Sequence, residues 1–380
     1  MTLRACSLVS KAWAEPANIL LYSSLTLVWN LRTVTRLHRS FSSNPALALL
    51  VSSLHAAFTT HQAWLDKSRR AQEEAPRSLI DESNGNTSTT PPIPTTPVQP
   101  DGPWSKSEED EPYATAELIR LLRYLSPDRF RTLKLEGFAA SPTNLKRCEV
   151  PVDVRTILNN VTTLVCNTNI WPRESHGDNN CILKLLLPLL PNLQTLEGSD
   201  TGREPGWGAA EWWWGNALRP SLLALDTARI EYSRRGAAGA LTPDIMLAPS
   251  LRSLTLSHPD VAILAILPAT LHSLRIEKCI LADPSELFWY LRRSTLRHLA
   301  LDWYPRSLLE WLPMSISALE VRTDKIERLV NHALGYKRTT LVGLAELRVR
   351  SPAWMVLSAR QREEQVARAA SGGVSMILVE

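Results

Sequence analysis

The sequence predicts an α/β solenoid of leucine-rich repeats, with a parallel sheet on the concave side and helices on the convex side. Three observations predict it. The pattern apolar-x-x-apolar-x-apolar occurs ten times between residues 130 and 379. Helix-forming stretches lie between several copies, and the 380-residue length suits growth by repetition. Because one repeat cannot bury its apolar face alone, stacked neighbours must share a continuous core.

The ten copies recur at the period expected of leucine-rich repeats. They begin at residues 130, 161, 193, 222, 251, 271, 296, 316, 344 and 374, so successive starts lie 20 to 32 residues apart. Such spacing is typical of leucine-rich repeats, with some units slightly long. In the unit Leu271/Leu274/Ile276, Cys279 takes the Asn/Cys position, which caps backbone groups where the chain leaves the strand. A generic Leu-rich α/β domain is the alternative.

Three copies are irregular, and it is less evident which of their residues occupy the apolar positions. The copy at 193 has Gly198 at its third apolar site. We assign the copy at 222 as Leu222/Leu225/Thr227 and the last copy as Val374/Ile377/Val379.

Capping signals predict the convex helices between the strands. Asp283–Glu286 supplies an N-cap, a proline at the first helical position and a glutamate at the third. Asp324–Leu334 has apolar residues at helical spacing, and Gly335 is the expected C-cap. Ala116–Leu125 is a third predicted helix.

The chain divides into three zones by pattern. Residues 1–65 look helical, including a predicted helix over Ala46–Phe58, and we expect them to cap the solenoid. Residues 66–112 are rich in proline, serine, threonine and acids, which predicts a disordered linker. Residues 113–380 hold the ten repeats.

Composition excludes several classes of protein. Apolar residues make up 44% and charged residues 21%, which excludes wholesale disorder. The net charge of +4 comes without a dense basic block, so we expect no nucleic-acid partner. The sequence contains no run of about 18 apolar residues, so we expect no membrane-spanning helix. Five scattered cysteines without a CxxC pair predict a reducing compartment, cytoplasmic or nuclear.

No motif for catalysis, cofactor binding or metal binding is present. The sequence lacks GxSxG, HExxH, GxxxxGK[ST] and GxGxxG. The cluster His176-Gly177-Asp178 with Cys181 is better explained as a turn. We therefore expect a protein that is not an enzyme and that needs no cofactor or metal.

The N-terminal residues resemble fungal F-box proteins over about 1–58. The matching segments contain Leu3, Cys6, Leu8, Val9, Trp13, Tyr22, Leu25, Asn44, Pro45 and Leu54. The resemblance implies that Leu3, Cys6, Leu8, Val9 and Trp13 face the Skp-type adaptor of a cullin–RING ubiquitin ligase. The family's Leu-Pro start and first helix have no counterpart before Leu3, so a helix that only caps the solenoid is the alternative.

Side chains between the apolar positions predict the partner-binding face. They alternate with core residues and so point to the concave side. The candidates are Lys134, Glu197, Thr255, Arg275, His298 and Arg348. Plain solvation of a sheet face is the alternative. Trp207 and Trp212–Trp214 lie in a Gly-rich insertion and either pack on the solenoid or anchor a partner.

Together these features predict a substrate-recognition subunit of an SCF-type ubiquitin ligase, which binds an unknown target protein through its repeats. The first alternative is a stand-alone repeat scaffold without ligase binding. An enzyme with an unrecognised site and a secreted repeat protein are more distant alternatives.

Overall fold

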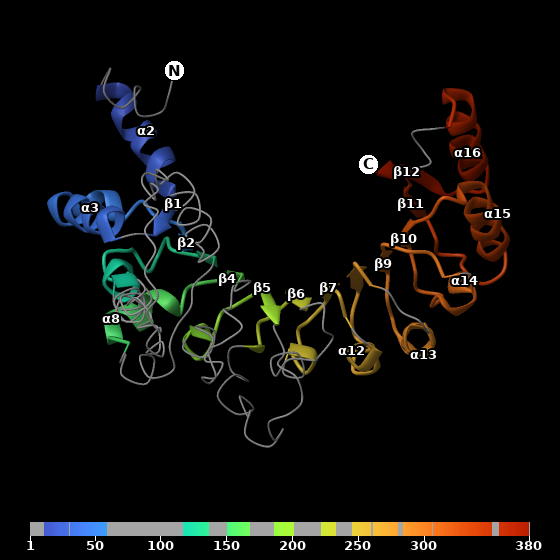
Figure 1. Cartoon of the computed structure of the whole chain (residues 1–380), viewed down its shortest axis with the longest axis horizontal. Coiled ribbons are helices and arrows are strands. Elements are labelled where there is room, and N and C mark those ends of the chain that lie inside the picture. Colours follow the sequence, from blue (N-terminus) through green and yellow to red (C-terminus); the bar gives the residue numbers. More distant parts are fainter. Residues whose placement is uncertain are drawn as a thin grey trace, which may run out of the picture.

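The fold is the predicted α/β solenoid of leucine-rich repeats. The computed structural model describes residues 11–29, 31–58, 117–136, 150–167, 186–200, 222–232, 245–259, 261–279, 284–305, 307–351 and 357–379. Within these ranges, twelve strands form one sheet in which each strand lies beside its neighbours in sequence. Every neighbouring pair is parallel. The sheet curves into an arc with β1 at one end and β12 at the other (Figure 1).

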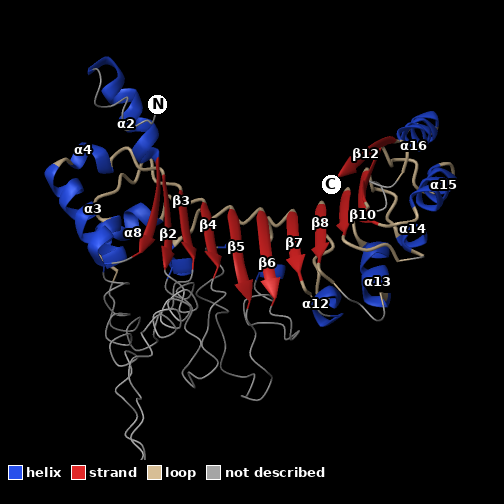
Figure 2. Cartoon of the chain, turned by 45° about the horizontal axis from the view of Figure 1, so that its top comes forward, coloured by secondary structure: helices blue, strands red, loops and turns tan. Residues whose placement is uncertain are grey.

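The strands are short, and helices cover the outer side of the arc (Figure 2). The strands are β1 Ser24–Trp29, β2 Ser53–Phe58, β3 Thr132–Glu136, β4 Thr163–Asn167, β5 Thr195–Asp200, β6 Thr227–Tyr232, β7 Ser253–Ser257, β8 Ser273–Glu277, β9 His298–Leu301, β10 Ala318–Arg322, β11 Glu346–Arg350 and β12 Ser375–Val379. The helices are α2 Lys11–Ser23, α3 Leu31–Ser43, α4 Pro45–Ala48, α8 Val152–Leu158, η1 Leu187–Leu189 (a 3₁₀ turn), α12 Val261–Ala265, α13 Ser285–Arg293, α14 Leu308–Trp311, α15 Ile326–Lys337 and α16 Ala359–Ser371.

The aliphatic pattern forms one continuous core between the sheet and the helices. In β3, Leu133 and Leu135 are fully buried, while Lys134 between them is exposed. Leu133 lies in register with Leu54 on one side and Leu164 on the other. Burying one leucine side chain contributes about 1.5–3 kcal/mol, so the stacked pattern dominates the stability of the sheet.

The sheet begins before the first repeat assigned from the sequence. The helix predicted over Ala46–Phe58 is wrong, because α4 ends at Ala48 and Ser53–Phe58 is strand β2. Val51, Leu54 and Ala56 are fully buried and form the same pattern as the later repeats. Their i, i+3 spacing also matches a helix, so the periodicity alone is ambiguous.

Two of the ten assigned registers are wrong. In β6, Ala228 and Ile230 pair with Leu254 and Leu256, so this unit begins at residue 225 and not at 222. Alanine at a leucine position conceals the true register. In β12, Met376 pairs with Leu347, and Ile377 is 41% exposed. The run Met-Ile-Leu-Val is apolar on both faces, so alternation cannot identify the buried one.

The helix ends differ from the predicted caps. Helix α15 continues through Gly335, the predicted C-cap, and ends at Lys337, whose ammonium group donates a 2.9 Å hydrogen bond to the Gly373 carbonyl. That bond ties the end of α15 to the next repeat. Helix α13 begins at Ser285, and the predicted N-cap Asp283 lies outside the described residues. The predicted helix over Ala116–Leu125 is observed at 117–122.

Cys279 performs the predicted capping role. Its thiol is buried and donates to the carbonyl oxygen of Pro259 in the preceding repeat at 3.6 Å. Burial raises the pKa of the Cys279 thiol to about 12, so the group stays protonated and can donate at neutral pH. The adjacent Lys278 and its counterpart His258 have positive φ angles of 51° and 58°, which turn the chain out of the strand.

Candidate partner-binding face

The concave face is built from the strand residues that point away from the core. In each strand they alternate with buried aliphatic residues, and parallel pairing aligns them into ladders across the sheet. The first ladder carries small hydroxyl side chains over eight consecutive strands. Its members are Ser24, Ser53, Thr132, Thr163, Thr195, Thr227, Ser253 and Ser273.

The second ladder carries charges of both signs in the later strands. From β5 to β11 it consists of Glu197, Arg229, Thr255, Arg275, Ala300, Glu320 and Arg348. In this ladder Thr255 separates Arg229 from Arg275, and Ala300 separates Arg275 from Glu320. That spacing lets opposite charges reach one another across the intervening strand.

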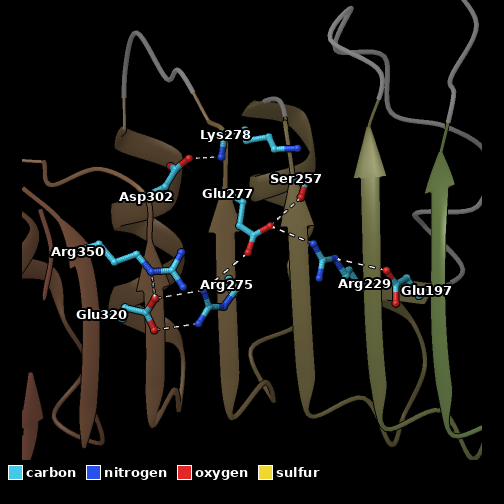
Figure 3. A network of polar contacts seen from close by, with 9 residues as sticks. All are labelled: Glu197, Arg229, Ser257, Arg275, Glu277, Lys278, Asp302, Glu320 and Arg350. Carbon is cyan, nitrogen blue, oxygen red and sulfur yellow. Dashed lines mark hydrogen bonds and ion pairs between the residues drawn. The ribbon is translucent and has the colours of Figure 1, made fainter. Parts of the chain in front are cut away.

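A bidentate ion pair joins Arg275 and Glu320 in the later strands of the face. The Nη1 and Nη2 atoms of Arg275 donate to the two carboxylate oxygens of Glu320 at 3.2 and 2.9 Å (Figure 3). The two residues come from β8 and β10, about 10 Å apart at the strand spacing. Ala300 of β9 lies between them in register, and its small side chain leaves room for the contact.

Glu320 is the most buried charged residue in this cluster. Its side chain is 8% exposed, and the Nε atom of Arg350 forms a second ion pair with it at 2.8 Å. Burying a carboxylate costs free energy unless charges and hydrogen bonds compensate it. Two guanidinium groups provide that compensation, which fixes all three side chains.

Glu277 extends the network toward β5. One of its oxygens accepts a hydrogen bond from Ser257 at 3.2 Å and forms an ion pair with Arg229 at 3.4 Å. Its other oxygen lies 3.7 Å from Arg275. Arg229 in turn lies 3.8 Å from Glu197. A chain of polar contacts thus runs from β5 to β11, and we call it the concave network (Figure 3).

Polar contacts also lie beside the concave network. Lys278 forms an ion pair with Glu231 at 3.4 Å, and its backbone amide donates to Asp302. In the first strands, His55 and Glu136 lie 3.1 Å apart. The face as a whole therefore offers hydrogen bonds and ion pairs to a partner.

The six predicted face residues all lie on strands, but only some of them meet. Glu197 and Arg275 belong to the concave network, and Thr255 occupies the ladder position between Arg229 and Arg275. Arg348 pairs with Glu346 on its own strand. Lys134 and His298 are exposed at their ladder positions.

Sequence reasoning missed five residues of the network. They are Arg229, Ser257, Glu277, Glu320 and Arg350. The wrong register of β6 concealed Arg229. The face residue after the third apolar position of each unit, which includes Glu277 and Arg350, would have been found by extending the pattern one residue further.

Several predicted sites cannot be placed. Leu3, Cys6, Leu8 and Val9 lie outside the described residues, and Trp13 lies in α2, where its side chain is not described. The Pro-rich segment 66–112, the His176 cluster and Trp207 with Trp212–Trp214 also lie outside them.

The described residues show neither a candidate metal site nor a candidate membrane-spanning helix. Those residues contain no group of three histidine, cysteine or acidic residues arranged to hold a metal ion. None of the described helices has the length and apolar character needed to cross a bilayer.

Comparisons with known proteins find likeness only among solved structures. No family model and no curated protein matches the sequence. The chain is similar to the leucine-rich repeat-containing protein LegL7 from Legionella pneumophila, with a TM-score of 0.40 and 16% identity over 69% of this chain and 86% of that chain. It is also similar to a chain in a TLR13–ssRNA13 complex, with a TM-score of 0.27 and 14% identity over 62% of this chain and 37% of that chain. Both likenesses are distant, so the fold rests on the strand order and register described above.

Proposed function

We propose that this chain is a protein-binding scaffold that holds a folded partner against its concave face. The concave network is the observation that carries the proposal. Its side chains are already fixed by ion pairs, so a partner that matches their charges loses little side-chain entropy on binding. Complementary charges on the partner would then determine specificity. In this proposal the chain has no catalytic role, needs no cofactor, and binds neither nucleic acid nor a membrane.

The proposal predicts that bulk added at the centre of the face abolishes partner capture. Thr255→Arg places a long charged side chain between Arg229 and Arg275, whereas Thr156→Arg places the same side chain on helix α8 at the outer surface. The measurement is quantitative mass spectrometry of proteins retained by each immobilised full-length variant. We expect Thr255→Arg to lose partners that the wild type and Thr156→Arg retain; equal retention by both variants would contradict the proposal.

We also propose a more specific role, as the substrate-recognition subunit of an SCF-type ubiquitin ligase. Two observations support this role. The sequence of residues 1–58 resembles an F-box, and helix α2 is followed directly by strand β1. An adaptor bound near residues 3–13 would therefore be joined to the solenoid without a long flexible linker. The chain would then raise the effective concentration of a bound target near the ubiquitin carrier.

Direct binding to a Skp-type adaptor tests the ligase role. The full chain and the variant Leu8→Asp are compared by isothermal titration calorimetry, with Leu223→Asp, at an exposed position of the solenoid, as the control. We expect binding that Leu8→Asp removes and Leu223→Asp preserves. If the wild type does not bind the adaptor, the ligase role is contradicted and the stand-alone scaffold remains as the proposed function. Capping alone would instead lower the melting temperature of Leu8→Asp without any effect on an adaptor.

We further place the protein in a reducing compartment, the cytoplasm or the nucleus. Cys279 is a buried free thiol, which is the usual state of a cysteine that fills a core rather than forms a disulfide.

A further inference from the structure

A hollow of about 400 Å³ lies at the edge of the sheet where strands β9 and β10 end. Its lining residues are Asp302, Trp303, Tyr304, Arg322, Thr323, Asp324, Lys325 and Arg328. The carboxyl ends of parallel strands are a common place for ligands, because loops and helix starts converge there. A second hollow of about 340 Å³ shares Arg328 and is also lined by Glu310, His332 and Tyr336.

The cations around the first hollow lack the partners that other arginines of the face have. Arg229, Arg275, Arg348 and Arg350 each form an ion pair with a glutamate. Within the described part of the chain, the side chains of Arg322, Lys325 and Arg328 form no ion pair. Three positive charges around one concavity repel each other, and an anion between them would remove that repulsion.

Two hydrogen-bond donors add to this arrangement. The hydroxyl of Tyr304 is buried and has no hydrogen-bond partner within the described residues. Burial raises the pKa of Tyr304, with Arg328 opposing the rise, so the hydroxyl keeps its proton at neutral pH. Helix α15 starts beside the hollow, where the Thr323 hydroxyl accepts from the amide of Lys325, while the side chain of the N-cap residue Lys325 makes no capping hydrogen bond to the first turn. The backbone amides of its first turn therefore add positive potential.

Two carboxylates at the hollow reduce the positive charge without cancelling it. The Oδ2 atom of Asp302 accepts a hydrogen bond from the amide of Lys278, its buried Oδ1 atom has no hydrogen-bond partner within the described residues, and Asp324 is exposed. The first hollow is thus lined by three cations and two carboxylates beside a helix N-terminus, whereas Glu310 lines the second hollow together with Arg328, so we expect an anionic group in the first hollow.

We propose that this hollow binds the phosphate group of a phosphate monoester. Arg328, which lines both hollows, would contact the phosphate together with Arg322 and Lys325, and Tyr304 would donate a hydrogen bond to it. Arginine recognises phosphate with two parallel donors, and such contacts are stronger than neutral hydrogen bonds. The two hollows together exceed the volume of a phosphate group, so the molecule that carries it also has room.

The carrier is either a free small molecule or a phosphorylated side chain of a protein, and the test separates the two. Full-length protein is titrated by calorimetry with adenosine monophosphate, adenosine, and a phosphoserine peptide with and without its phosphate. We expect binding only of the probes that carry phosphate. Tighter binding of adenosine monophosphate assigns a small-molecule ligand, and tighter binding of the peptide assigns a phosphorylated protein.

Matched variants test the residues of the site. Arg328→Gln should weaken binding about tenfold or more, because it removes a charge-assisted contact. Tyr304→Phe should weaken it several-fold. Arg297→Gln makes the same charge change at an exposed position outside the hollow and should leave the affinity unchanged. Failure of every phosphate probe to bind at millimolar concentration, or an equal effect of Arg328→Gln and Arg297→Gln, would overturn the proposal. Neither result depends on whether a protein partner binds the concave network.

Discussion

The first and later parts of the concave face share one backbone register but carry different chemistry. In strands β1–β4 the hydroxyl ladder, which continues to β8, is accompanied by a 3.1 Å contact between His55 and Glu136. Strands β5–β11 present the concave network, which includes the half-buried Arg275 and the buried Glu320. The core side of the sheet is aliphatic in both parts. The difference teaches that the repeat fixes the fold, whereas the residues between its apolar positions decide what the surface can bind.

The largest expected effect is a common loss of stability in both parts when the core is truncated. Leu133→Ala in β3 and Leu274→Ala in β8 each remove a fully buried side chain. We expect each to lower the free energy of unfolding by about 2–5 kcal/mol, because a cavity remains. Urea denaturation monitored by circular dichroism measures the change. Lys134→Ala, at an exposed position between two core leucines, is the control and should change stability by less than about 0.5 kcal/mol.

The second prediction separates the two parts by removing one charge from each. Arg275→Ala leaves the buried carboxylate of Glu320 with Arg350 as its one remaining ion-pair partner among the described residues. Breaking a fully buried pair costs about 3–5 kcal/mol, and partial exposure of Arg275 reduces the expected loss to about 2 kcal/mol. Lys134→Ala removes a charge from the first part without breaking an ion pair. Equal effects of the two variants in urea denaturation would show that the network adds no stability.

The third prediction tests the role of the small residue between the paired charges. Ala300→Leu introduces a side chain at the ladder position that Arg275 must cross to reach Glu320. We expect a loss of about 1–2 kcal/mol, less than for Arg275→Ala, because both charges remain and can partly reorient. Ala300→Ser is the control, since it adds one atom and a hydroxyl like those of the first ladder. A Leu variant as stable as the Ser variant would show that Arg275 reaches Glu320 by another path.

The aliphatic core side of the sheet could be predicted because buried positions carry apolar residues at a regular spacing in the sequence. The same repeat position holds a leucine in several units, as at Leu133, Leu254 and Leu274, and this regularity made the parallel sheet predictable. The pattern failed where the buried residue was small, as at Ala228, or where both faces were apolar, as in β12. In each case the side chains no longer distinguish the core face from the solvent face.

The concave network could be predicted only in part. Glu197 and Arg275 were identified as face residues, but their partners were not. Arg275 reaches Glu320 across a third strand, 45 residues along the chain. Such a contact depends on the register of three strands and on a small residue in the middle one. No local spacing in the sequence encodes it, so the pairing is evident only in the folded structure.

The smallest expected effect lies at the exposed end of the network and depends on salt. The side chains of Arg229 and Glu197 are 51% and 38% exposed, and their ion pair spans 3.8 Å. Because exposed pairs contribute only about 0.2–1 kcal/mol and are screened by salt, Glu197→Ala, which removes this pair and leaves the pair of Arg229 with Glu277 in place, should cost less than about 1 kcal/mol at about 50 mM salt and almost nothing at about 1 M. The loss caused by Arg275→Ala should persist at both salt concentrations, because water and ions reach Glu320 poorly. Urea denaturation of both variants at the two ionic strengths measures this contrast. Equal salt sensitivity would place Glu320 in the same solvent environment as Glu197 and would remove the distinction between the centre of the network and its edge.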